Sequence, residues 1–152
     1  LIRREILKVK KEKAELSSKK FVLTSDKDLV TIREYGRKLA SKLGFDNNSQ
    51  TLISTALSEV CRNVIEYANS GEVTFVYNSS SRNGITITVS DQGPGIDDIK
   101  KALQEGYSTG QGLGVGLPGA KRIMDEFEIE SSNSEGTTIR MCKWQNNHTQ
   151  FL

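Results

Sequence analysis

Two polar side chains, Glu59 and Asn63, interrupt an apolar helical pattern that runs from Asn48 to about Ala68. At about 100° per residue, Asn63 falls inside the apolar arc of this predicted helix, and Glu59 lies at the edge of the arc one turn earlier. A carboxylate and an amide that face a core are costly unless something pairs with them. Glu59 could act as a general base and Asn63 could offer a neutral oxygen to a hard cation. A buried hydrogen-bonded pair, or a simple edge position, is the structural alternative.

A second group of candidate residues begins at Asp91, directly after the predicted strand Ile85–Ser90. Gly93 and Gly95 follow at alternate positions, and glycine removes the side chains that would block the approach of a ligand. The Asp91 carboxylate could accept a hydrogen bond from an exocyclic amine such as that of adenine. A Pro-Gly turn that Asp91 caps is the simpler alternative.

Glycine is concentrated in one part of the chain: eight of the 13 glycines and both prolines lie between Asp91 and Gly119. The run 110–119 ends where an amphipathic helix begins, and free backbone N–H groups at a helix N-terminus favour an anion such as phosphate. Gly114–Gly119 matches GxGxxG, but no strand directly precedes it, so a Rossmann site is not expected. Ala120 stands where a Walker A loop requires lysine. A flexible linker is the alternative, which the abrupt switch into the helix disfavours.

Hydrophobic periodicity predicts the elements that must position these residues. Helices are expected from Ser25 or Asp26 to Leu43, from Asn48 or Ser49 to Ala68, and over about 117–126. Strands are expected at Phe21–Leu23, Glu72–Asn78, Ile85–Ser90, Phe127–Ser132 and Thr137–Trp144. Helices and tight hairpins grouped in this way predict a two-layer α/β sandwich with a mixed, mostly antiparallel sheet and the helices on one face.

Composition narrows the function classes. A chain of 152 residues fits one domain, and a net charge of only +2 argues against a dedicated nucleic-acid binder. No apolar run approaches the length needed to cross a bilayer, and no signal peptide is visible. The lack of such a run predicts no contact with a membrane. The two cysteines form no metal or redox motif, which suits a reducing compartment, so we expect a cytoplasmic protein. A single histidine, His148, nearly excludes histidine-based catalysis and histidine-ligated zinc.

The ends of the chain differ from its middle. Residues 1–20 carry eight Lys or Arg and three Asp or Glu, which predicts a basic N-terminal extension. This segment is either a solvated helix or linker, or a contact for an acidic partner. Residues 145–152 are expected to be a polar C-terminal tail.

Three motifs in order, Glu59-x-x-x-Asn63, Asp91-x-Gly93-x-Gly95 and Gly112-x-Gly114-x-Gly116, resemble those of the GHKL superfamily of ATP-binding proteins. The resemblance covers Phe21 to about Trp144 and implies one ATP-binding kinase domain, residues 21–144, with the GHKL (Bergerat) fold. Within the superfamily the chain is similar to the RsbT-type switch-protein serine kinases of the anti-sigma regulatory factor family. The segments behind this closer similarity are 91–96, 107–109, 112–119, 121–127 and 135–137.

The resemblance implies ATP and Mg²⁺ as ligands and a role for each matching position. Glu59 would be the catalytic base, Asn63 would bind the metal ion, and Asp91 would read the adenine amine. Backbone close to the nucleotide would come from Gly93 and Gly95, phosphate-binding amides from Gly112, Gly114 and Gly116, and further adenine recognition from Thr137. Residues from about Ile96 to Gln111 would form a lid over the nucleotide.

The function that the resemblance implies is an ATP-dependent protein serine/threonine kinase in bacterial stress or sigma-factor signalling. Its substrate would be a STAS-domain regulator, and a PP2C-type phosphatase would be a second partner. Two alternatives share the same motifs: an anti-sigma factor that sequesters a sigma factor, and a non-catalytic nucleotide-sensing module. The motifs leave the oligomeric state open.

Overall fold

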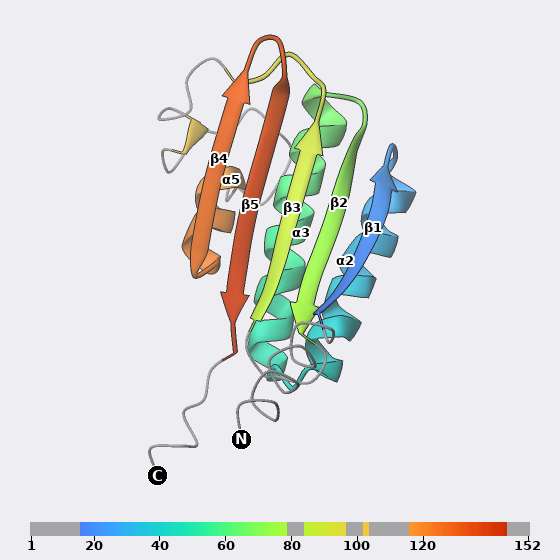
Figure 1. Cartoon of the computed structure of the whole chain (residues 1–152), viewed down its shortest axis with the longest axis vertical. Helices are drawn as coiled ribbons and strands as arrows, with labels where there is room; N and C mark the ends of the chain where they lie inside the picture. Colours follow the sequence, from blue (N-terminus) through green and yellow to red (C-terminus); the bar gives the residue numbers. More distant parts are fainter. Residues whose placement is uncertain (1–15, 79–83, 97–101, 104–115, 146–152) are drawn as a thin grey trace, which may run out of the picture.

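The computed structural model describes residues 16–78, 84–96, 102–103 and 116–145. Five strands form one sheet in the order β1-β2-β3-β5-β4, and the helices lie together on one face of it (Figure 1). This arrangement confirms the predicted two-layer α/β sandwich. The elements are β1 (Leu16–Leu23), α2 (Asp26–Lys42), α3 (Asn47–Tyr67), β2 (Gly71–Asn78), β3 (Gly84–Asp91), α5 (Gly116–Ile123), β4 (Glu126–Ser132) and β5 (Gly136–Trp144).

The sheet differs from the expected mixed type, because all four strand pairings are antiparallel. β3 and β4 do run parallel to each other, as a connection through a helix permits, but they are not neighbours. The tight turn between β4 and β5 folds β5 back into the space between them, so that β5 pairs with both. β3 and β4 therefore run in the same direction, but no two parallel strands among the described ones are hydrogen-bonded to each other in this sheet.

The helix ends follow local capping rules. Ser25 caps α2 by accepting a hydrogen bond from the Asp28 backbone N–H, and the Asp28 carboxylate in turn accepts one from the Thr24 N–H at 2.9 Å. This second bond lowers the pKa of Asp28. Gly44, at φ +94°, follows the end of α2 as predicted. α3 begins after Asp46, which accepts from the Ser49 N–H at 2.7 Å, so the cap is neither of the two predicted residues.

Two element boundaries differ from the prediction for reasons of long-range pairing. β1 begins at Leu16, because backbone pairing to β2 continues as far as Asn78 without an apolar pattern to mark it. The boundary expected after residue 20 thus falls inside a strand, and residues 1–15 lie outside the described part of the chain. α5 ends at Ile123, whose carbonyl oxygen accepts a hydrogen bond from Lys143 Nζ at 2.9 Å, instead of near residue 126.

The hydrophobic core lies between the sheet and the helices. α3 supplies the buried face that the helical periodicity predicted, and β2 and β3 supply alternating inward side chains. Gly36 of α2 lies against Leu57 so closely that a Cβ at this position would overlap the leucine side chain. The largest side chains that are fully buried are Phe75, Leu23, Ile32, Ile53, Leu57, Ile85, Ile87, Ile139, Met141, Val60, Val73 and Val89.

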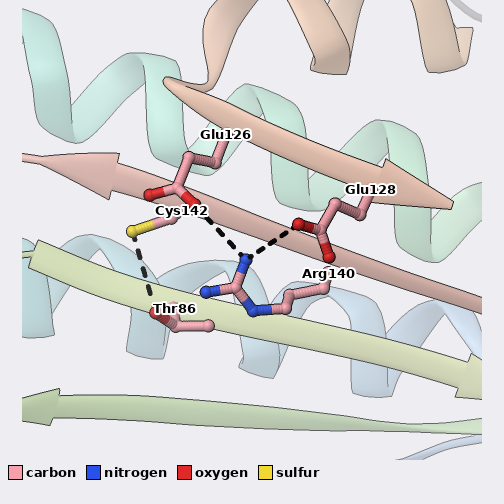
Figure 2. Close-up of polar contacts among 5 residues, drawn as sticks. All are labelled: Thr86, Glu126, Glu128, Arg140 and Cys142. Carbon is pink, nitrogen blue, oxygen red and sulfur yellow. Dashed lines mark hydrogen bonds and ion pairs between the residues drawn. The ribbon is translucent and has the colours of Figure 1, made fainter.

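The opposite face of the sheet carries polar pairs between neighbouring strands (Figure 2). Arg140 of β5 lies 3.5 Å from a Glu126 oxygen and 3.8 Å from a Glu128 oxygen, both on β4. Thr86 of β3 donates a hydrogen bond to the Cys142 sulfur at 3.7 Å. Exposed ion pairs of this kind stabilise a fold by about 0–1 kcal/mol each. Within the described ranges, no helix combines the length and the apolar character that crossing a bilayer requires.

Candidate functional site

The connection of the strands brings three candidate segments to one end of the molecule. β3 ends at Asp91, and β4 runs parallel to β3 because both are antiparallel to β5. α5 leads into the start of β4, so its N-terminus at Gly116 is directed toward the end of the sheet where β3 finishes (Figure 1). The C-terminal turns of α3 lie at the same end.

Asp91 is the centre of a hydrogen-bonded unit at this end. Its side chain is buried, and Oδ1 accepts one hydrogen bond from the Gly93 N–H at 2.9 Å and a second from the Thr137 N–H at 3.2 Å. Both bonds end on the same oxygen, which leaves Oδ2 outside them. The unit therefore holds a buried carboxylate in one orientation, and no hydrogen bond between described residues ends on Oδ2.

Two glycines allow the backbone segments to meet around Asp91. Gly136 has φ +80°, and a Cβ on it would lie far inside the 3.0 Å separation from the Asp91 carbonyl oxygen that real Cβ contacts keep. Gly95 has φ +79°, and a Cβ there would overlap the Ser132 carbonyl oxygen. These positions need glycine twice, for the left-handed backbone conformation and for the close approach. The sequence predicts Gly95 as a site residue, whereas Gly136 belongs only to the segment 135–137 that supports the similarity to the switch kinases.

Glu59 and Asn63 lie one turn apart on α3. Glu59 is buried, with 8% of its surface exposed, and its Oε1 forms an ion pair with Arg62 Nη1 at 3.2 Å. Asn63 is half-buried. The partner of the buried carboxylate is thus Arg62 and not Asn63. Arg62 belongs to none of the sequence motifs, although its position three residues after Glu59 is a spacing that allows contact on a helix.

The end of α3 contacts the loop that follows β3. A Cβ on Gly93 would lie 2.5 Å from the Ala68 Cβ, and a Cβ on Gly71 would lie 2.9 Å from a Val64 methyl group. The helix that carries Glu59 and Asn63 is therefore packed directly against the turn that Asp91 organises. Cys61, between the two polar residues in sequence, faces the core, and burial raises the pKa of its thiol to about 12.

Part of the predicted site lies outside the described residues. Gly112, Gly114 and all of the expected lid except Ile96 and residues 102–103 fall there. Gly116 is described: it has φ +45° and begins α5. The described ranges contain no group of three or more His, Cys, Asp and Glu side chains arranged to hold a metal ion. The predicted magnesium ligand is an amide, Asn63, which such a group would not include.

Residues 23–143 match the family model of the histidine kinase-like ATPase domain. The chain belongs to this family, which confirms the superfamily resemblance and the fold drawn from the three motifs. Among solved structures, the fold is similar to the RsbU and RsbW domains of a Mycobacterium tuberculosis protein, with a TM-score of 0.57 and 18% identity, over 84% of this chain and 33% of that one. It is also similar to the mycobacterial sensor histidine kinase MprB, with a TM-score of 0.50 and 17% identity, over 86% of this chain and 99% of that one. At these identities the likeness shows the fold alone.

Closer relatives come from sequence comparison. The chain is 46% identical over 118 residues to the serine/threonine-protein kinase RsbT of Bacillus subtilis, a match that spans 77% of this chain and 89% of the relative. It is 39% identical over 97 residues to an anti-sigma F factor of a Thermoanaerobacter species, across 60% of this chain and 68% of the relative. The name of the first relative agrees with the switch-kinase resemblance, and the name of the second agrees with the anti-sigma factor alternative.

Proposed function

We propose that this protein is an ATP-dependent serine/threonine kinase of the switch type, which acts in the cytoplasm on a STAS-domain regulator in bacterial stress or sigma-factor signalling. The observation that carries the proposal is the buried Glu59 carboxylate on a helix whose end packs against the Asp91 turn. Similarity to a relative named as a serine/threonine-protein kinase supports the same reaction.

Asp91 would read the adenine base. Its Oδ1 is used by two backbone N–H groups, so Oδ2 is the oxygen for the exocyclic amine. Gly93 and Gly95 would shape the turn beside the base, because a side chain on either would collide with Ala68 or Ser132, and Thr137 would add a polar contact from β5. Asp91 suits adenine recognition because its carboxylate is already held in one orientation before a ligand binds, which reduces the entropy cost of ordering the side chain.

Asn63 would hold Mg²⁺ through its side-chain oxygen, an uncharged hard donor of the kind that this ion accepts. When bound, the metal supplies charge neutralisation for the phosphates. Gly112, Gly114 and Gly116 would donate backbone N–H groups to the phosphate oxygens, and the N-terminus of α5 at Gly116 adds the positive end of a helix dipole.

Glu59 would act as the general base. Its carboxylate would take the proton of a serine or threonine hydroxyl as the hydroxyl oxygen forms a bond to the γ-phosphorus and the bond to the bridging oxygen breaks, releasing ADP. Arg62 occupies Oε1, which leaves Oε2 as the oxygen for the proton. The ion pair also keeps a buried charge compensated in the resting enzyme.

Phosphate transfer to a STAS-domain protein tests the proposal. Glu59→Gln is expected to keep ATP affinity within about threefold and to lower the transfer rate by about 10²–10⁴-fold, the usual contribution of a general base. Glu66→Gln, at an exposed position on the same helix, is the matched control and should transfer at the wild-type rate. Equal transfer by Glu59→Gln and the wild type would remove Glu59 from the base role.

A second function is favoured by the similarity to an anti-sigma F factor: binding and sequestration of a sigma factor. Affinity capture with the nucleotide-loaded protein separates the two. Recovery of a STAS-domain protein, alone or with a PP2C-type phosphatase, supports the switch kinase. Recovery of a sigma factor without a STAS-domain protein supports the second function, and tight ATP binding without any transfer supports a nucleotide-sensing module.

A further inference from the structure

The loop 92–96, which follows β3, is fixed at both ends by hydrogen bonds that meet on Thr137. At its start, the Gly93 N–H bonds to Asp91 Oδ1, which also accepts the Thr137 N–H. At its end, the Ile96 N–H donates to Ser131 Oγ at 2.6 Å, and that oxygen lies 2.7 Å from Thr137 Oγ1.

Ser131 of β4, 35 residues after Ile96 in sequence, links the end of this loop to Thr137. A hydroxyl offers one donor and two acceptor sites, so Ser131 can bond the Ile96 N–H and the Thr137 hydroxyl at the same time. Either hydroxyl can donate the hydrogen bond between them, and in both cases this bond restricts the direction in which the Thr137 O–H can point. Gly95 adds a steric constraint, since it lies against the Ser132 carbonyl oxygen.

We infer that Ser131 is a positioning residue of the nucleotide site: its hydroxyl fixes the Gly93–Ile96 backbone and the orientation of the Thr137 hydroxyl. The inference rests on the proposed ATP site and assigns to that site a residue outside all three motifs. Among the hydrogen bonds of the described residues, Ser131 has none to the predicted catalytic group, so we expect its effect to be confined to nucleotide affinity. The phosphate-transfer step at Glu59, on α3, should proceed at the same rate once ATP is bound.

The test compares Ser131→Ala with Ser131→Thr in the full chain. Ser131→Ala removes the oxygen that bonds the loop and Thr137, and we expect about a tenfold rise in the Kd for Mg·ATP by calorimetry and in the KM for ATP, with kcat within twofold of the wild type. Ser131→Thr keeps the hydroxyl on a β-branched side chain that suits a strand, and it should restore the wild-type Kd. Ser132→Ala is the matched control, because the Ser132 hydroxyl accepts only from the turn at Glu135 in the described hydrogen bonds.

The outcomes separate the inference from the proposed function. A wild-type protein that does not bind Mg·ATP overturns the proposed function and the inference with it. Wild-type binding with equal Kd values for Ser131→Ala and Ser132→Ala overturns the inference alone. A Ser131→Thr variant that binds as weakly as Ser131→Ala, at a wild-type melting temperature, also overturns it, because the hydroxyl would then have no role. A fall in kcat without a change in KM would contradict the confinement to nucleotide affinity.

Discussion

Replacing Asp91 by asparagine separates the role of this residue in folding from its role in binding. An asparagine oxygen can still accept the two N–H groups of Gly93 and Thr137, so the free energy of unfolding should fall by less than about 1 kcal/mol. The group that replaces Oδ2 becomes an N–H₂ donor, which cannot accept a hydrogen bond from the adenine amine. The loss of one hydrogen bond to a charged group, about 1.5–3 kcal/mol, corresponds to roughly 10- to 150-fold weaker ATP binding.

Calorimetry with Mg·ATP measures the affinity, and urea denaturation of the same samples measures the stability. Asp28→Asn is the control, because Asp28 also accepts a backbone N–H, at the start of α2 and away from the site. Asp91→Ala should behave differently from Asp91→Asn. It leaves the buried Thr137 N–H and the part-buried Gly93 N–H without their acceptor, and the buried group alone costs about 1–3 kcal/mol of stability. If Asp91→Asn binds ATP as tightly as the wild type, Asp91 does not read the adenine amine.

Three further changes test other parts of the structure. Gly136→Ala forces an L-residue to φ +80° against the end of β3, and it should lower the unfolding free energy by at least about 1–3 kcal/mol and weaken ATP binding. Gly44→Ala, at φ +94° and far from the site in sequence, should lower stability alone. Equal ATP affinities of the two variants, in samples whose stability is matched with urea, would contradict the role of Gly136 in the site. Arg62→Ala leaves the buried Glu59 carboxylate without its ion-pair partner. The free energy of unfolding, measured by urea titration, should fall by about 1–2 kcal/mol, a reduced figure because the guanidinium is partly exposed. An unchanged free energy of unfolding would show that solvent compensates the Glu59 charge. In the folded protein the Cys61 pKa is raised from 9.0 to about 12, so the thiol of the unfolded chain loses its proton first as the pH rises. Between these two pKa values the wild type should lose stability by up to about 1.4 kcal/mol per pH unit more than Cys61→Ala. Parallel stability profiles of the two proteins against pH would refute the raised pKa.

The sequence predicted the helices and the hairpin with good accuracy, since their signals lie within a few neighbouring residues. The α2 cap at Ser25 and the stop at Gly44 are both local features, and both were confirmed. The family was also accessible from the sequence, because three short motifs in a fixed order were enough to indicate it. The roles of Glu59 and Asn63 remain predictions.

Contacts between segments that lie far apart in the chain could not be predicted from the sequence. The insertion of β5 between β3 and β4 depends on the pairing of β5 with β3, two strands that lie far apart in the sequence. The extension of β1 to Leu16 follows from backbone pairing that leaves no apolar signature. Neither feature has a cause within its own segment.

The sequence by itself determined which residues prefer a helix, a strand or a turn, because those preferences arise from sterics and hydrogen bonds between near neighbours. Only the tertiary structure decided that Ser131 meets Ile96 and that Gly136 lies against Asp91. Each of these pairs is separated by more than 30 residues, and the hydrogen bonds and close contacts between them exist because the sheet places the ends of β3, β4 and β5 side by side.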